Sequence, residues 1–149
     1  MTTDRRELLV AEEAGWVEII DLVSSLTSEQ LEERGYSDDG WSVKDLIAHI
    51  GAWHAEAARV LREIRIGTYE RRGLDVDALN REFYEANQDL SASLVTAESA
   101  ASRNRMIAEW KVLPRITAEA GEWFRESGPE HYAEHLPRLR QWVLAIRSR

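Results

Sequence analysis

Residues 41–67 read WSVKDLIAHIGAWHAEAARVLREIRIG, and this stretch decides the fold. Ser42, followed three residues later by Asp45, is typical of a helix N-terminus, where both side chains accept hydrogen bonds from free backbone N–H groups. Apolar residues then recur at helical spacing, namely Leu46, Ile50, Trp53, Ala57, Val60, Leu61 and Ile64. Gly67 is a suitable C-terminal stop. The stretch therefore predicts one long helix that buries one face.

Helical patterns continue on both sides of this stretch. We expect further helices over about 4–25, from Thr27 to Gly35, over 76–89, from about 93 to Leu113, after Thr117, and after the break at 127–129. No segment shows sustained alternation of apolar and polar residues, so we expect no sheet. The sequence predicts an all-α protein, a four-helix bundle with short additional helices that forms one domain over residues 1–149.

The composition limits the kinds of partner and metal site that we expect. The chain has no cysteine, so a metal ion would have to be held by His, Asp or Glu. The formal net charge of −8 argues against a nucleic-acid partner, which needs a positive face. No apolar run approaches the roughly 18 residues of a membrane helix, and the N-terminus has no signal-peptide pattern. We therefore expect a cytoplasmic protein with neither a nucleic-acid nor a membrane partner.

The histidines are the strongest candidates for chemistry. His131 and His135 are four residues apart on the apolar stripe of the last helix, so their rings project from one face. His49 lies on the flank of the apolar face of the helix that starts at Ser42. If the three converge inside the bundle, they form a metal site with open coordination positions. The alternatives are histidines on the helix surface, or core histidines that are hydrogen-bonded to carbonyls.

The fourth histidine, His54, lies about 140° around the helix from His49, so we expect it to be a pocket or surface residue rather than a ligand. Candidates for a general base are Glu134, Tyr132, Glu56 and Asn80. From a helical wheel we expect Glu134 to point away from the histidine stripe and to be a solvated acid. No base is singled out by the sequence.

Six tryptophans are spread along the chain, and they could line a pocket or fill the core. Trp123 is one candidate for a pocket wall. The residues that we predict for the pocket itself are Trp53, Asn80, Tyr84, Trp110 and Trp142.

Three segments together resemble the DinB-like superfamily. Residues 41–50, with Trp53, resemble its second-helix signature, and residues 131–142, HYAEHLPRLRQW, resemble its last-helix signature. Residues 77–84, DALNREFY, are similar to the subgroup near ClbS-type self-resistance proteins. The resemblance covers nearly the whole chain in the right order.

This resemblance implies a four-helix bundle with an unusual connection order that often dimerises, so we expect a homodimer. It also implies a divalent metal ion, zinc or nickel first and iron next, held by His49, His131 and His135. Relatives include S-transferases that use low-molecular-weight thiols and mycothiol-dependent maleylpyruvate isomerases. A small-molecule substrate and a thiol cofactor are therefore implied.

Three functions follow from these observations. The first is a metal-dependent enzyme, either a thiol S-transferase or a hydrolase that acts on a reactive small molecule. The second is a ClbS-like protein that binds or inactivates a toxic small molecule without metal chemistry. The third is a non-catalytic dimeric helical module whose histidines have no active role.

Overall fold

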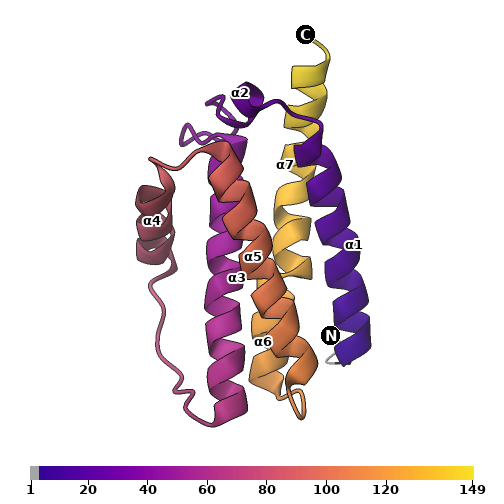
Figure 1. Ribbon diagram of the computed structural model, residues 1–149, viewed down its shortest axis with the longest axis vertical. Helices are drawn as coiled ribbons and strands as arrows, with labels where there is room; N and C mark the ends of the chain where they lie inside the picture. The colour runs from indigo at the N-terminus through magenta and orange to yellow at the C-terminus, as the bar shows by residue number, and fades with distance from the viewer. Residues whose placement is uncertain (1–3) are drawn as a thin grey trace.

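The computed structural model describes residues 4–149, and in this part of the chain every regular element is a helix (Figure 1). The helices are α1 (Arg5–Ser24), α2 (Ser28–Leu31), α3 (Val43–Ile66), α4 (Val76–Asn87), α5 (Ala92–Val112), α6 (Ala118–Ser127) and α7 (Pro129–Arg147). The prediction of an all-α fold is confirmed. Within the same residues, no helix combines the length and apolar character that crossing a membrane would require.

The four long helices α1, α3, α5 and α7 lie side by side, with α1 and α7 running one way and α3 and α5 the other (Figure 1). Because α4 carries the chain back along the outside of the bundle, α5 starts at the same end as α3 and runs parallel to it (Figure 1). This order differs from a simple up-down-up-down bundle. It agrees with the unusual connection order that the resemblance implies.

Local signals set the helix ends largely where the sequence predicts them. Ser42 and Asp45 form a complete capping box at the start of α3, and Gly67 ends that helix with φ of 81°. The exception is α2, which ends at Leu31 and not at Gly35. Gly35 has φ of 103° and donates its backbone N–H to the carbonyl of Trp41, so this segment is a turn rather than helix.

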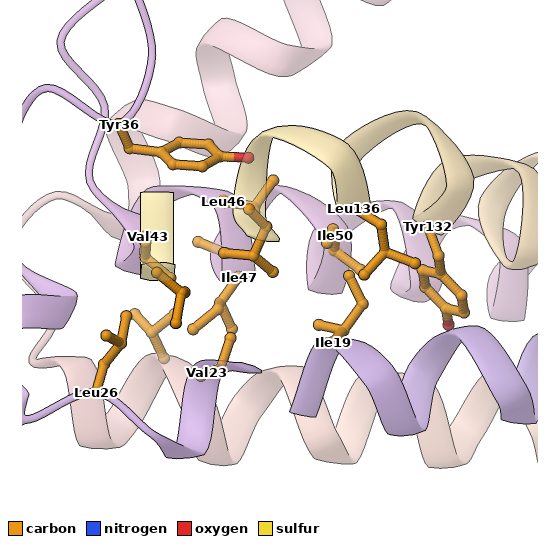
Figure 2. Packing of buried hydrophobic residues seen from close by; sticks show 14 of the residues in the cluster. Ile19, Val23, Leu26, Tyr36, Val43, Leu46, Ile47, Ile50, Tyr132 and Leu136 are labelled. Carbon is orange, nitrogen blue, oxygen red and sulfur yellow. The ribbon is translucent and has the colours of Figure 1, made fainter. Parts of the chain in front are cut away.

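The core consists of two apolar clusters. The first joins α1, α3 and α7, and Figure 2 shows the packing of Ile19, Ile50 and Leu136 within it. The second lies around Leu61, Met106, Trp110 and Phe124. Trp110 is fully buried and stacks on Phe124 with ring centroids 4.1 Å apart. The prediction that Trp110 lines a pocket is therefore wrong, because this ring is part of the core.

A break at Gly128 separates α6 from α7 and fixes where the last helix begins. A Cβ atom at Gly128 would lie 2.9 Å from the carbonyl oxygen of Phe124 and 3.1 Å from Cγ of Glu12, so a larger residue would not fit. Pro129 then occupies the first position of α7, where its missing N–H is tolerated. His131 follows within the first turn.

Candidate metal centre

The histidines at positions 49, 131 and 135 come together inside the bundle. Nε2 of His49 lies 2.9 Å from Nε2 of His131, and one ring nitrogen from each residue lies within 4.8 Å of the others. The ring centroids are 4.8–5.3 Å apart. The structure thus brings together the side chains that the sequence singles out, from α3 and from one face of α7.

All three imidazoles are neutral near pH 7. Burial lowers the pKa of His49 to about 4 and that of His131 to about 2, and the neighbouring histidines add to both shifts. Burial also lowers the pKa of His135. A neutral imidazole carries a free lone pair, which is the form that binds a metal ion.

Several of these ring nitrogens are buried without a partner. Nδ1 of His49, Nδ1 of His131 and Nε2 of His135 make no hydrogen bond to any described residue. Two nitrogens 2.9 Å apart can both reach one ion at a zinc–nitrogen bond length of about 2.0–2.1 Å. The widest separation, 4.8 Å, exceeds the roughly 4 Å that two ligands of one ion can span, so a small ring movement would bring all three nitrogens onto one ion. The donor set therefore fits a divalent ion such as zinc or nickel.

A pocket of about 290 Å³ opens beside His49 and His131. Its wall is formed by α3, α4, α6, α7 and the segment before α4. The remaining lining residues are Trp53, Leu74, Val76, Asn80, Trp123, Glu126, Ser127 and Glu134. Nε1 of Trp53 donates a hydrogen bond of 2.7 Å to Oδ1 of Asn80, which ties α3 to α4 at this wall.

The predicted pocket residues separate into two groups. Trp53 and Asn80 line this pocket. Tyr84 does not line it, because its ring stacks on Trp41, which in turn packs against His49. Trp142 packs edge-on against Tyr36, with ring centroids 6.3 Å apart, in the core. The prediction that Tyr84 and Trp142 line the pocket is therefore wrong.

Glu134 lines the same pocket as His131, so the expectation that it points away from the histidine stripe is wrong, whereas its exposure agrees with the expected solvated acid. On a helical wheel, a residue three positions on lies about 60° from the first, which places Glu134 beside His131 and not opposite it. Of the other candidate bases, Glu56 is paired with Arg59 at 2.9 Å outside the pocket. Tyr132 is fully buried behind the histidines.

A second buried polar cluster, which we call the Glu12 network, lies on the other side of α7. Glu12 accepts two hydrogen bonds from Arg103, of 2.6 and 2.8 Å, and one of 2.8 Å from the hydroxyl of Tyr132. That hydroxyl also lies 2.7 Å from Nε2 of His54. A Cβ atom at Gly15 would come within 2.7 Å of the Tyr132 ring, so α1 and α7 approach closely here.

His54 is thus neither a pocket residue nor a surface residue, because its side chain is fully buried in this network. Burial lowers its pKa to about 3, and the charge of Arg103 acts in the same direction. The sequence analysis missed Glu12 and Arg103. One sequence signal could have indicated a buried acid, because Glu12 is spaced to lie on the same face of α1 as the buried Leu8 and Ile19.

Helices α3 and α7 of this bundle bring three neutral histidines together beside a pocket. This arrangement is a DinB-like fold with a three-histidine cluster. The chain belongs to the family described as the mycothiol maleylpyruvate isomerase N-terminal domain, which matches residues 13–144. This confirms the resemblance to the DinB-like superfamily. A search of curated proteins found no match.

Two solved structures share the fold. An uncharacterised protein from Escherichia coli UTI89 is similar over 99% of this chain and 96% of its own, with a TM-score of 0.82 and 19% identity. The colibactin self-resistance protein ClbS, solved in complex with a dsDNA, is similar over 95% of this chain and 96% of its own, with a TM-score of 0.79 and 14% identity.

The second structure corrects the expectation about nucleic acid. A protein with this fold has been solved with double-stranded DNA, so the exclusion of a nucleic-acid partner is wrong. The exclusion relied on the net charge of −8, which averages over the whole surface and says nothing of a local contact.

Proposed function

We propose that this protein is a divalent-metal-dependent enzyme, either a thiol S-transferase or a hydrolase, that acts on a reactive small molecule. The observation that supports it is the set of three neutral imidazoles with unpartnered buried nitrogens, two of them on the wall of a pocket. Nε2 of His49 and Nε2 of His131 face each other at 2.9 Å, and Nε2 of His135 is buried without a hydrogen-bond partner, so an ion shared by the three rings is favoured as their common partner.

In this proposal His49, His131 and His135 hold the metal ion. Such an ion lowers the pKa of a bound water or thiol and polarises an electrophile. Trp53 and Trp123 cover apolar parts of the ligand and exclude water from the pocket. Glu134 is the carboxylate of α7 that lines the pocket, and we propose that it accepts the proton from the nucleophile. A low-molecular-weight thiol is the proposed nucleophile of the transferase reaction.

The first test is the metal content of protein purified without a metal-affinity tag, measured by elemental mass spectrometry. We expect nearly one zinc, nickel or iron ion per chain, and less than about a tenth of that in the His49→Ala and His131→Ala variants, because each removes a ligand. His54→Gln is the control, since it removes a buried histidine that lies outside the cluster. Circular dichroism verifies that each variant is folded.

The proposal would be refuted if the His131→Ala variant contained as much metal as the native chain. It would also be refuted if the native chain did not bind added zinc or nickel. If metal is bound, turnover of thiol with electrophile is compared before and after chelation. Turnover that survives complete removal of the metal would likewise refute the enzymatic part.

The second candidate is a ClbS-like role in which the protein binds a reactive small molecule without metal chemistry. The pocket beside Trp53 and Trp123 favours it, because two indole rings with centroids 6.4 Å apart form an apolar wall. Protection of cells by the His131→Ala variant would support this role over the first. Double-stranded DNA belongs in the same binding assays, because the ClbS structure contains it.

A further inference from the structure

The charged groups that line the pocket beside His49 and His131 are all acidic. Glu126 extends from α6 and Glu134 from α7, and no lysine or arginine is among the lining residues of the described chain. Neither carboxylate forms an ion pair with a residue in the range 4–149. The pocket therefore offers negative charge that the protein itself does not neutralise.

Crowding of like charges supports this interpretation for Glu126. Partial burial, together with the nearby carboxylates of Glu122 and Glu130, raises the pKa of Glu126 above its usual range. Glu130 has a partner, since its side chain lies 3.1 Å from Arg125. The positive charge of Arg125 acts in the opposite direction, and a cation beside Glu126 would further offset the repulsion from Glu122 and Glu130.

The pocket lining also contains aromatic and apolar side chains. The rings of Trp53 and Trp123 are tilted by 35° with their centroids 6.4 Å apart, and both line the pocket. Leu74 and Val76, which also line it, are 43% and 49% exposed. Indole faces attract cations as well as flat apolar groups, and tryptophan does so most strongly among the aromatic residues.

Two arginines lie farther out, in an adjoining groove that shares Leu74, Trp123 and Glu126 with the pocket. Arg71 is 3.8 Å from Glu119 and Arg72 is 4.0 Å from Glu70, and both side chains are at least 77% exposed. At this exposure their charges are screened by solvent. They therefore do not reverse the acidic character of the pocket itself.

We propose that this pocket selects ligands with a flat apolar body and a cationic nitrogen, and that it discriminates against anionic ligands of the same shape. The inference rests on the proposed function in placing the ligand beside the histidines. It adds the chemical class of the substrate. His131, only 8% exposed and on the pocket wall, marks the end at which the reactive group of the ligand would lie.

The test compares tryptamine and indole-3-propionate by isothermal titration calorimetry, two probes that share an indole ring on a two-carbon chain and carry opposite charges at its end. The protein is used both after treatment with EDTA and loaded with zinc, because a carboxylate probe could ligate the ion. In the metal-free protein we expect tryptamine to bind at least about fivefold more tightly. In the Glu126→Gln/Glu134→Gln double variant this preference should fall to about one.

Two further variants separate charge from shape. Glu82→Gln removes one exposed carboxylate of α4 that does not line the pocket, so the preference should remain. Trp123→Ala should weaken both probes, because it removes a shared wall, and should weaken tryptamine more, because the cation also loses an indole face.

Equal binding of the two probes to metal-free protein, or tighter binding of indole-3-propionate, would overturn the inference even if the protein holds a metal ion. A preference for tryptamine that is unchanged in the double variant would overturn it too. A preference that follows Glu126 and Glu134 in a protein that binds no metal would support the inference and contradict the proposed enzyme.

Discussion

The two sides of α7 both carry buried polar side chains, but they differ in their partners. An ion pair ties the Glu12 network together, although Nδ1 of His54 within it has no hydrogen-bond partner, whereas the three-histidine cluster contains no charged side chain. On one side, His131 and His135 meet His49, and several ring nitrogens have no hydrogen-bond partner among residues 4–149. On the other side, Glu12 accepts hydrogen bonds from both Arg103 and Tyr132. An acid that accepts several buried hydrogen bonds stabilises the fold, whereas neutral imidazoles that converge without a charged partner favour a missing ligand.

The largest effect is expected for Glu12→Ala. This change leaves the guanidinium of Arg103 and the hydroxyl of Tyr132 without their shared acceptor in the interior. Breaking a buried pair by removing one partner lowers the free energy of unfolding by about 3–5 kcal/mol. Urea denaturation measures this loss. His135→Ala, compared in metal-free protein, should lose much less, and equal losses would mean that the two sides do not differ as described.

Acidification should destabilise the protein through His54, whose pKa is lowered from about 6.5 when unfolded to about 3 when folded. Between these values the unfolded chain binds a proton that the folded chain does not, so stability falls as pH falls and is constant above about 6.5. The slope is roughly 1.4 kcal/mol per pH unit for one histidine. Urea denaturation of metal-free protein from pH 7 to pH 4.5 should show a shallower slope for His54→Gln. Parallel slopes would contradict the burial of a neutral His54.

Tyr132→Phe should have a smaller effect, because only the hydroxyl between Glu12 and His54 is lost. Leaving Nε2 of His54 without a partner lowers the free energy of unfolding by about 1–3 kcal/mol. Because the ring remains, α7 keeps its packing, and we expect the metal content to stay the same. Loss of metal from a folded Tyr132→Phe variant would show that the Glu12 network also positions the histidines.

The smallest effect is expected for Asn80→Ala, which removes the acceptor of the 2.7 Å hydrogen bond from Trp53. A partly exposed hydrogen bond contributes about 0.5–1.5 kcal/mol, so thermal denaturation should shift only slightly. The fluorescence of Trp53 should change, because its indole N–H then faces solvent. An unchanged spectrum would indicate that α4 is not tied to α3 in this way.

Much of the fold could be predicted because the signals are local. Ser42, Thr117 and Pro129 mark helix starts within a few residues of sequence, and the structure places helices directly after or at them. Likewise, His131 and His135 share a face by spacing alone. Whether they meet His49 depends on how two helices that are distant in the sequence pack together. The family resemblance implied this contact, but residue spacing alone could not predict it.

The Glu12 network could not be predicted in the same way. Glu12 and Arg103 are 91 residues apart, and nothing in either local pattern indicates the other. The placement of Trp110 and Trp142 in the pocket was wrong for a related reason. These residues have the same chemistry as Trp53, and only the packing of the helices decides which tryptophan lies in the core and which lines the pocket. Formation of one domain over residues 1–149, the homodimer and the cytoplasmic location stay predictions.

The crossover through α4 has a consequence for how this protein could diversify. The histidines stand on the long bundle helices, whereas Leu74, Val76 and Asn80 belong to the crossover between α3 and α5. None of these three residues is part of either core cluster. Substitutions in the crossover can therefore alter what enters the pocket while the bundle helices and the histidine cluster stay unchanged, a modular division of the fold between ligand selection and scaffold.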